Sequence, residues 1–147
     1  MFNKEIKLKH IKALAFSALT LLAFSAHAQT NDVVTLKKSL NQWQPLEITK
    51  HKDTLTVTLN EDRVTPQIYE AVASTGICTD IWLKDVPADF LKSVKHINIL
   101  NKHSYSGYVF DDPLKTCNAM GKEQDEKAKV LLLSSTHLYT SADRDQH

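Results

Sequence analysis

Cys78 and Cys117 are the residues whose type and spacing indicate the clearest chemistry. They are the only cysteines in the 147-residue chain, and 38 residues separate them. That distance is too long for a Cys-X-X-Cys redox pair, and the paired close spacings of a structural zinc site are absent. An even number of cysteines in an exported protein is typical of a disulfide. We predict a Cys78–Cys117 bond, which would stabilise the fold by about 4 kcal/mol in the chain-entropy model.

Motifs for catalysis, metal binding or nucleotide binding are absent from the sequence. With three glycines in the chain, the glycine-rich loops that cradle phosphates are excluded. No histidine pair has the His-Glu-X-X-His spacing, and no serine lies in a Gly-X-Ser-X-Gly setting. Asp111 and Asp112 directly precede Pro113, so we assign both carboxylates to capping a helix rather than to acid–base chemistry. The sequence therefore predicts no catalytic residue, no metal ligand and no cofactor.

The best candidate for a binding site is a polar turn with aromatic side chains. The stretch 103–106 reads His-Ser-Tyr-Ser, and Tyr108 follows it. Tyrosine and serine on a loop are the adaptable, low-entropy contacts that binding surfaces use. We predict a binding role for His103, Tyr105 and Tyr108. The alternative interpretation is that the same composition simply makes a soluble turn.

The first 28 residues have the pattern of a signal peptide. Residues 1–12 carry four lysines and one glutamate, residues 13–26 are mostly apolar, and Ala26-His27-Ala28 follows. The apolar run is 14 residues long, whereas a bilayer-spanning helix needs about 20. We predict cleavage after Ala28 and export to the periplasm or the cell exterior, with no membrane insertion afterwards. Gln29 stands where a lipoprotein would have a cysteine.

The remaining chain is close to neutral. The whole sequence has 18 basic and 17 acidic residues, and removal of the leader leaves 14 basic and 16 acidic ones. This composition gives no basic patch for nucleic acid or anionic lipid. Residues 29–147 fit one domain, since domains commonly run about 100 to 150 residues. Residues 141–147 are expected to form a polar, frayed tail.

The periodicity of apolar residues predicts alternating helices and hairpins. Apolar residues spaced three or four apart favour helices, and apolar–polar alternation favours strands. The predicted elements are a helix over 31–43, strands over 46–50 and 55–59, a helix from Pro66, a short helix over 88–94, strands over 97–100 and 107–110, a helix over 113–120 and a strand over 130–139. Residues 122–129 are expected to be a charged loop. Gly121 is expected to supply a left-handed helix stop.

The predicted fold class depends on how two segments are assigned. Residues 77–83 either continue the helix from Pro66 past Gly76 or form a separate extended piece, and we favour the helix. The consecutive apolar residues of 130–133 suggest a strand covered on both faces, in the middle of the sheet. The resulting prediction is an α+β fold, with a mostly antiparallel sheet of about five strands and helices packed on one face.

Small size, a disulfide and the missing catalytic motifs favour a non-enzymatic exported module. We expect it to bind another protein or an envelope component, as an inhibitor, an immunity-type protein or an accessory factor. One alternative is a small secreted hydrolase or toxin that uses His103 with a carboxylate the sequence does not identify. Another is a small-ligand carrier, which requires a sizeable apolar pocket between helices and sheet.

Overall fold

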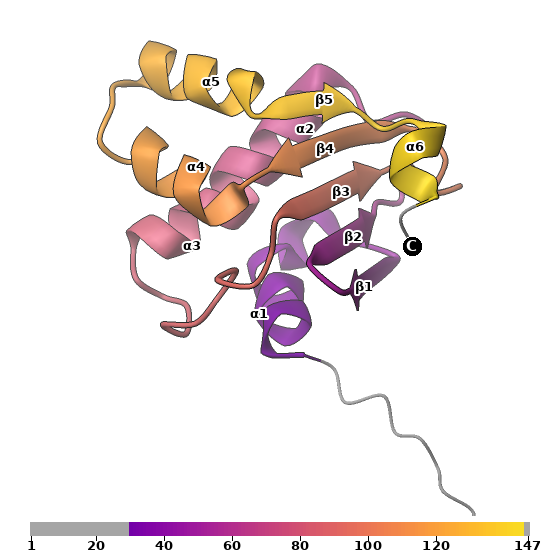
Figure 1. Ribbon diagram of the computed structural model, residues 1–147, viewed down its shortest axis with the longest axis horizontal. Helices are drawn as coiled ribbons and strands as arrows, with labels where there is room; N and C mark the ends of the chain where they lie inside the picture. The colour runs from indigo at the N-terminus through magenta and orange to yellow at the C-terminus, as the bar shows by residue number, and fades with distance from the viewer. Residues whose placement is uncertain (1–29, 146–147) are drawn as a thin grey trace, which may run out of the picture.

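The computed structural model describes residues 30–145, so the predicted leader and its cleavage site lie outside the described residues. A five-stranded sheet runs through the molecule in the order β1-β2-β3-β4-β5 (Figure 1). Its strands are β1 (Glu47–His51), β2 (Thr54–Thr58), β3 (His96–Leu100), β4 (Gly107–Asp111) and β5 (Thr136–Leu138). All neighbouring strands pair antiparallel except β2 and β3, which are parallel. The predicted mostly antiparallel α+β fold is confirmed.

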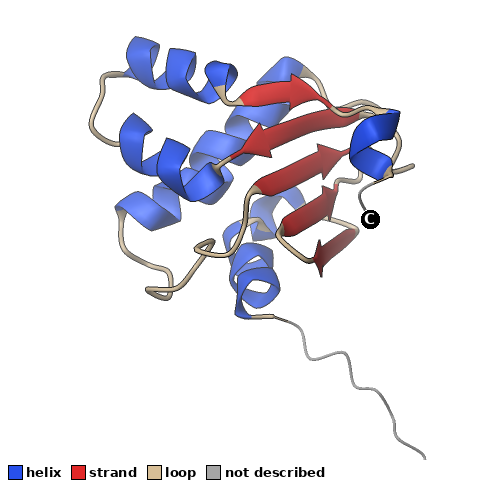
Figure 2. Cartoon of the chain, viewed as in Figure 1, coloured by secondary structure: helices blue, strands red, loops and turns tan. Residues whose placement is uncertain are grey.

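Helices cover one face of this sheet (Figure 2). They are α1 (Asn31–Ser39), the short η1 (Asn41–Trp43), α2 (Pro66–Ala71), η2 (Val72–Cys78), α3 (Thr79–Trp82), α4 (Pro113–Met120) and α5 (Asp125–Ser134). A single-turn helix, α6 (Ser141–Arg144), follows β5. Within residues 30–145, no helix combines the length and the apolar character needed to cross a bilayer.

The two faces of the sheet differ because side chains alternate along each strand. Ile97 and Ile99 of β3, like Phe110 of β4, join the apolar core beneath the helices. Their neighbours His96 and Asn98 point the other way. We call the side away from α1–α5 the outer face; it carries threonine, histidine and asparagine side chains, including those of Thr54, Thr56, His96, Asn98 and His137.

The helix that starts at Pro66 continues to Trp82, as favoured from the sequence. Thr65 caps it, since its hydroxyl accepts a hydrogen bond from the Ile68 amide at 3.2 Å. Gly76 does not end the helix but lies in η2, a π-helical stretch. A Cβ at this position would collide with Leu40 and lie 2.8 Å from Trp43 Cζ3. Glycine is therefore required by the close approach of η1, and not by a turn.

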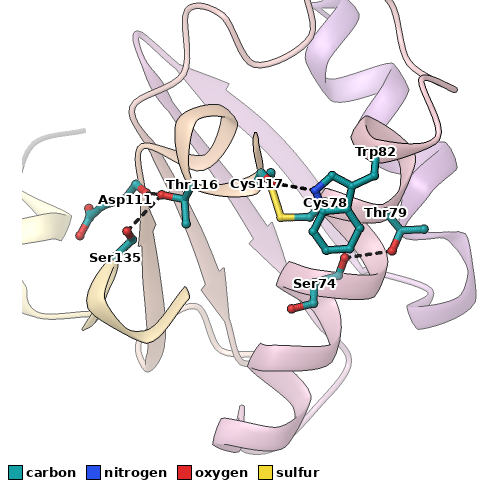
Figure 3. The surroundings of a disulfide bond; sticks show 8 residues. All are labelled: Ser74, Cys78, Thr79, Trp82, Asp111, Thr116, Cys117 and Ser135. Atoms are coloured by element: carbon teal, nitrogen blue, oxygen red, sulfur yellow. Dashed lines mark hydrogen bonds between the residues drawn. A yellow bond between two sulfur atoms is a disulfide. The ribbon is translucent and has the colours of Figure 1, made fainter. Parts of the chain in front are cut away.

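The predicted Cys78–Cys117 disulfide is confirmed and joins η2 to α4 (Figure 3). Both cysteines are fully buried. Trp82 lies beside the bond and donates from Nε1 to the Cys117 carbonyl at 2.6 Å. The expected left-handed stop at Gly121 is wrong, since its φ is −64°. The Trp82 ring explains this glycine instead, because a Cβ would lie 2.7 Å from it.

Residues 88–94 form consecutive turns and not the predicted short helix. The expected burial of Phe90, Leu91 and Val94 is correct. Leu91 has a positive φ of 61°, which no α-helix accommodates. Its amide donates to Asp32 Oδ1 at 2.9 Å. A side-chain acceptor on α1 thus replaces the helical hydrogen bonds that the apolar spacing suggested.

The prediction for residues 122–139 is wrong in the middle of this segment and correct only for the loop at 122–124 and the strand at 136–138. Residues 125–134 form α5, and the strand shrinks to the three residues of β5, at the edge of the sheet and not in its middle. Asp125 and Glu126 favour a helix start here because their charges complement the positive end of the helix dipole. Leu132 is buried, whereas Val130 and Leu133 are exposed. The apolar run therefore has one covered side only.

Candidate functional site

The three residues predicted for binding do not form one site. His103 and Tyr105 lie on the exposed loop after β3, and their rings stack with centroids 5.8 Å apart. Asn101 shapes this loop, since its Oδ1 accepts from the Tyr105 amide at 3.2 Å. Tyr108 belongs to β4 and packs on the other side of the sheet against Tyr69, with ring centroids 4.8 Å apart. The structure brings His103 and Tyr105 together and separates Tyr108 from them.

A chain of histidines and aspartates crosses the outer face. We call His96, Asp111, His137 and Asp143 the His–Asp cluster. His96 Nδ1 lies 2.8 Å from Asp111 Oδ1, and His137 Nδ1 lies 2.8 Å from Asp111 Oδ2. His137 Nε2 then reaches Asp143 Oδ1 at 3.0 Å. Three strands and α6 each contribute one member, so the sheet register positions the cluster.

The sequence prediction that Asp111 caps α4 is wrong. Its carboxylate is shared between two imidazoles instead. Asp112 has a positive φ of 43° and makes no side-chain cap hydrogen bond. The reason is that Asp111 is still the last residue of β4, where alternation turns its side chain to the outer face. Its backbone carbonyl accepts from Thr116 Oγ1 at 3.3 Å.

His137 is electrostatically the best-defined member of the cluster. Hydrogen bonding to Asp143 is the main cause that raises the pKa of His137 above its usual value, with Asp111 acting in the same direction and burial against it. For Asp143, burial favours the neutral carboxyl, but hydrogen bonds from His137 and Thr140 outweigh it and lower the pKa. The structure therefore favours a charged His137 imidazole beside an ionised Asp143.

The cluster borders a small polar cavity of about 250 Å³, lined by Thr54, His96, Asn98, Val109, His137 and Asp143. An imidazole held by a carboxylate is suited to proton transfer. No serine or cysteine lines this cavity to act as a nucleophile. Among residues 30–145, no group of three or more histidine, cysteine or acidic side chains could hold a metal ion. The His–Asp cluster thus places charged side chains beside the cavity, and the cavity lining contains no recognisable nucleophile.

A larger hollow lies between α1 and β1, and we call it the β1 groove. It has a volume of about 750 Å³ and is lined by Thr30, Val33, Lys37, Asn41, Gln44, Pro45, Leu46, Glu47, Ile48, Thr49 and Lys50. Val33 and Ile48 are buried and give it an apolar floor. Leu46 at its rim is 57% exposed. The groove therefore combines apolar surface with an exposed apolar side chain.

β1 forms an edge of the sheet. It pairs with β2 on one side, and no described strand pairs with its other side. An edge strand leaves backbone N–H and C=O groups available to another chain. At the opposite edge, β5 has only three residues. β1 is therefore the longer of the two described edges and borders the larger hollow.

A buried ion pair joins the two walls of the β1 groove. Lys50 Nζ lies 2.6 Å from Asp32 Oδ2, and these side chains are only 12% and 10% exposed. Lys50 also donates to Ser93 Oγ at 2.7 Å. Asp32 on α1 and Lys50 on β1 thereby fix the distance between the two walls of the groove.

Searches of protein-family models, curated proteins and solved structures find no match for the chain. The disulfide is consistent with an extracellular or periplasmic protein, since such bonds form in oxidising compartments. The geometry is therefore the basis for any functional proposal.

Sequence reasoning missed both the β1 groove and the His–Asp cluster. His96 directly precedes the predicted strand 97–100, and the alternation with Ile97 and Ile99 places it on the face opposite the core. That signal could have placed His96 on the outer face. His137 lay within the predicted strand 130–139, but the consecutive apolar residues of 130–133 did not indicate which face it would occupy. Asp143 fell in residues 141–147, which were expected to fray.

Proposed function

We propose that the chain is an exported, disulfide-closed recognition module that binds an extended segment of a partner protein in the β1 groove. The observation that carries this proposal is the groove of about 750 Å³ beside an edge strand. The predicted signal peptide and the Cys78–Cys117 bond support a location outside the cytoplasm. An extended segment would add to the sheet as a sixth strand next to β1.

The backbone of β1 supplies the first part of the interaction. A peptide that adds to an open sheet edge gains main-chain hydrogen bonds, and pockets for alternate side chains provide specificity. β1 spans five residues and contains no proline, so every residue keeps its N–H group. The strand is held in place by full pairing with β2. The edge is therefore preorganised, which lowers the entropy cost of binding.

The lining of the groove indicates the chemistry of the segment. Val33, Ile48 and the exposed Leu46 would receive apolar side chains at alternate positions of the segment. Lys37 on α1 lines the groove, whereas alternation along β1 turns Glu47 to the outer face, so the two charges would lie on opposite faces of the added segment. A segment with alternating apolar residues and mixed flanking charge fits this lining. The closed core and open groove favour binding over chemistry.

The alternative functions have less support. The polar cavity of about 250 Å³ is smaller than the roughly 300 to 1,000 Å³ typical of small-molecule sites. The β1 groove has a volume of about 750 Å³, within that range, but it runs along an open strand edge, which favours an extended segment over a small ligand. His103, the residue proposed for a hydrolase, lies on an exposed loop and stacks on Tyr105. Perturbed catalytic groups usually lie in clefts. Neither a hydrolase nor a carrier is therefore proposed.

The test is capture of a partner from a periplasmic extract by wild-type protein and two matched variants. Leu46→Asp places a charge in the groove, and Leu138→Asp places one on the opposite edge strand, where Leu138 is similarly exposed at 64%. We expect Leu46→Asp to weaken the captured interaction by about tenfold or more, equal to about 1.4 kcal/mol. Leu138→Asp should bind like the wild type. Equal binding by both variants, or no retained protein with the wild type, would contradict the proposal.

A further inference from the structure

α6 is held against the outer face by polar contacts. None of its residues is buried, and an isolated helix of this length is not stable in water. The Asp143 side chain links it to the sheet through His137 Nε2 at 3.0 Å. The other Asp143 oxygen accepts from the amide and the hydroxyl of Thr140, both at 2.8 Å, which completes a capping box. The His137–Asp143 contact therefore links α6 to the sheet.

Keeping both carboxylate contacts of His137 requires a charged imidazole. Both ring nitrogens of His137 face carboxylate oxygens, Asp111 Oδ2 at 2.8 Å and Asp143 Oδ1 at 3.0 Å. Ionised carboxylates only accept hydrogen bonds, and a neutral imidazole carries a single N–H. A neutral His137 would thus leave one nitrogen lone pair against a carboxylate oxygen, and with the remaining proton on Nδ1 that oxygen is the Asp143 oxygen that holds α6. The doubly protonated ring satisfies both contacts.

The groups around His137 all affect this equilibrium. Asp111 on β4 and Asp143 on α6 face the ring directly. His96 on β3 lies beyond Asp111 and bonds its other oxygen at 2.8 Å. Arg144 on α6 is exposed. Because the two nearest groups are both acidic, the imidazolium form is favoured.

We propose that His137 is a proton-controlled latch, which holds α6 on the outer face while its ring is charged and releases α6 when the ring loses a proton. Release would remove Asp143 from the wall of the cavity that Asn98 and Val109 also line. The device lies away from the β1 groove, so it goes beyond the proposed binding function. It also remains testable without a partner.

The direction of the pH effect follows from the two pKa shifts. The pKa of His137 is raised in the closed form, chiefly by Asp143, so closing is favoured at low pH and is lost as pH rises through the raised value. The pKa of Asp143 is lowered, since hydrogen bonds from His137 and Thr140 outweigh burial. Its contribution is lost as pH falls through that lowered value. The latch is therefore closed at mildly acidic pH and opens on both sides of that window.

The test is an NMR titration of the full protein from about pH 5 to about pH 9. Ring-proton shifts give the pKa of His137, and ¹³C relaxation gives backbone order parameters for residues 141–144 without relying on exchangeable amide protons. We expect order parameters near 0.85 to fall below about 0.6 as His137 deprotonates, with the same midpoint. Constant order parameters through that midpoint would overturn the proposal.

Two variants sharpen this test. His137→Gln cannot become charged, so residues 141–144 should be mobile at every pH in the range. His103→Gln removes an imidazole from a distant loop and should keep the wild-type titration of α6. If α6 in His137→Gln still loses order at the wild-type midpoint, another group controls the transition and the latch is wrong.

Discussion

Asp32 shows how one side chain can organise several segments. One of its oxygens accepts from Lys50 Nζ at 2.6 Å, and the other accepts from the Leu91 amide at 2.9 Å. α1, β1 and the turn over 88–94 thus meet at a single carboxylate. Removing one partner of a buried ion pair leaves the other charge buried without compensation. The stability cost should therefore exceed that of a surface pair.

Asp32→Ala should lower the free energy of unfolding by about 3 to 5 kcal/mol. The matched control is Lys38→Ala, which breaks the exposed pair between Lys38 and Asp85 at 3.4 Å, where both side chains are more than half exposed. Its expected effect is within about 1 kcal/mol. Urea denaturation of both variants measures the difference. Similar losses of unfolding free energy in the two variants would show that the buried Asp32–Lys50 ion pair does not stabilise the fold more than an exposed pair.

For single residues, the sequence predicted correctly those contacts for which it offers few possible partners. The disulfide could be predicted from two cysteines and an oxidising compartment. The Thr65 cap could be predicted from the proline that follows it. Asp111 was assigned to a cap because its local sequence favours capping. Its carboxylate instead bonds His96, 15 residues away, and His137, 26 residues away. Local sequence contains no information about such distant partners until the sheet register is known.

The helix–strand choice at residues 130–133 shows the limit at the scale of elements. A short apolar run fits a buried strand or one side of a helix equally well. Leucine, alanine, glutamate and lysine favour the helix, and α5 contains all four types. By contrast, β1 and β2 were predicted correctly from apolar–polar alternation, and β3 and β4 from two short apolar segments on either side of a polar turn.

Alanine substitutions distinguish the two structures of this segment. In α5, Leu132 is 1% exposed and Val130 is 65% exposed. Leu132→Ala should therefore cost about 2 to 5 kcal/mol, whereas Val130→Ala should change stability by about 0.5 kcal/mol or less. A central strand covered on both faces would make both substitutions costly. Thermal or urea unfolding of the two variants decides between these outcomes.

For the whole molecule, the disulfide ties the helix layer together. η2 follows the first hairpin and α4 follows the second, and the bond joins them across 39 positions of sequence. Closing a loop of this length restricts the unfolded chain. The double variant Cys78→Ala/Cys117→Ala should lose about 4 kcal/mol of unfolding free energy. An unchanged urea midpoint, with an unchanged slope, would show that packing alone holds these helices together.

The architecture also explains why the binding surface was not found from the sequence. His103 and Tyr105, on the loop between β3 and β4, were predicted to bind because their residue types are typical of binding loops. The β1 groove arises from the order of the strands and the placement of α1 beside the sheet edge. Its lining residues have ordinary types and ordinary spacing. Only the assembled sheet reveals that β1 is an edge.

The most direct test of the proposed function is amide hydrogen exchange of the disulfide-bonded protein with and without its captured partner. A segment added beside β1 should bond outward-facing amides of Glu47–His51 and slow their exchange by about tenfold or more, equal to about 1.4 kcal/mol. Amides of β5 should exchange at the same rate in both samples. Protection confined to the loop over 101–106 or to the outer face, with β1 unchanged, would contradict binding in the β1 groove.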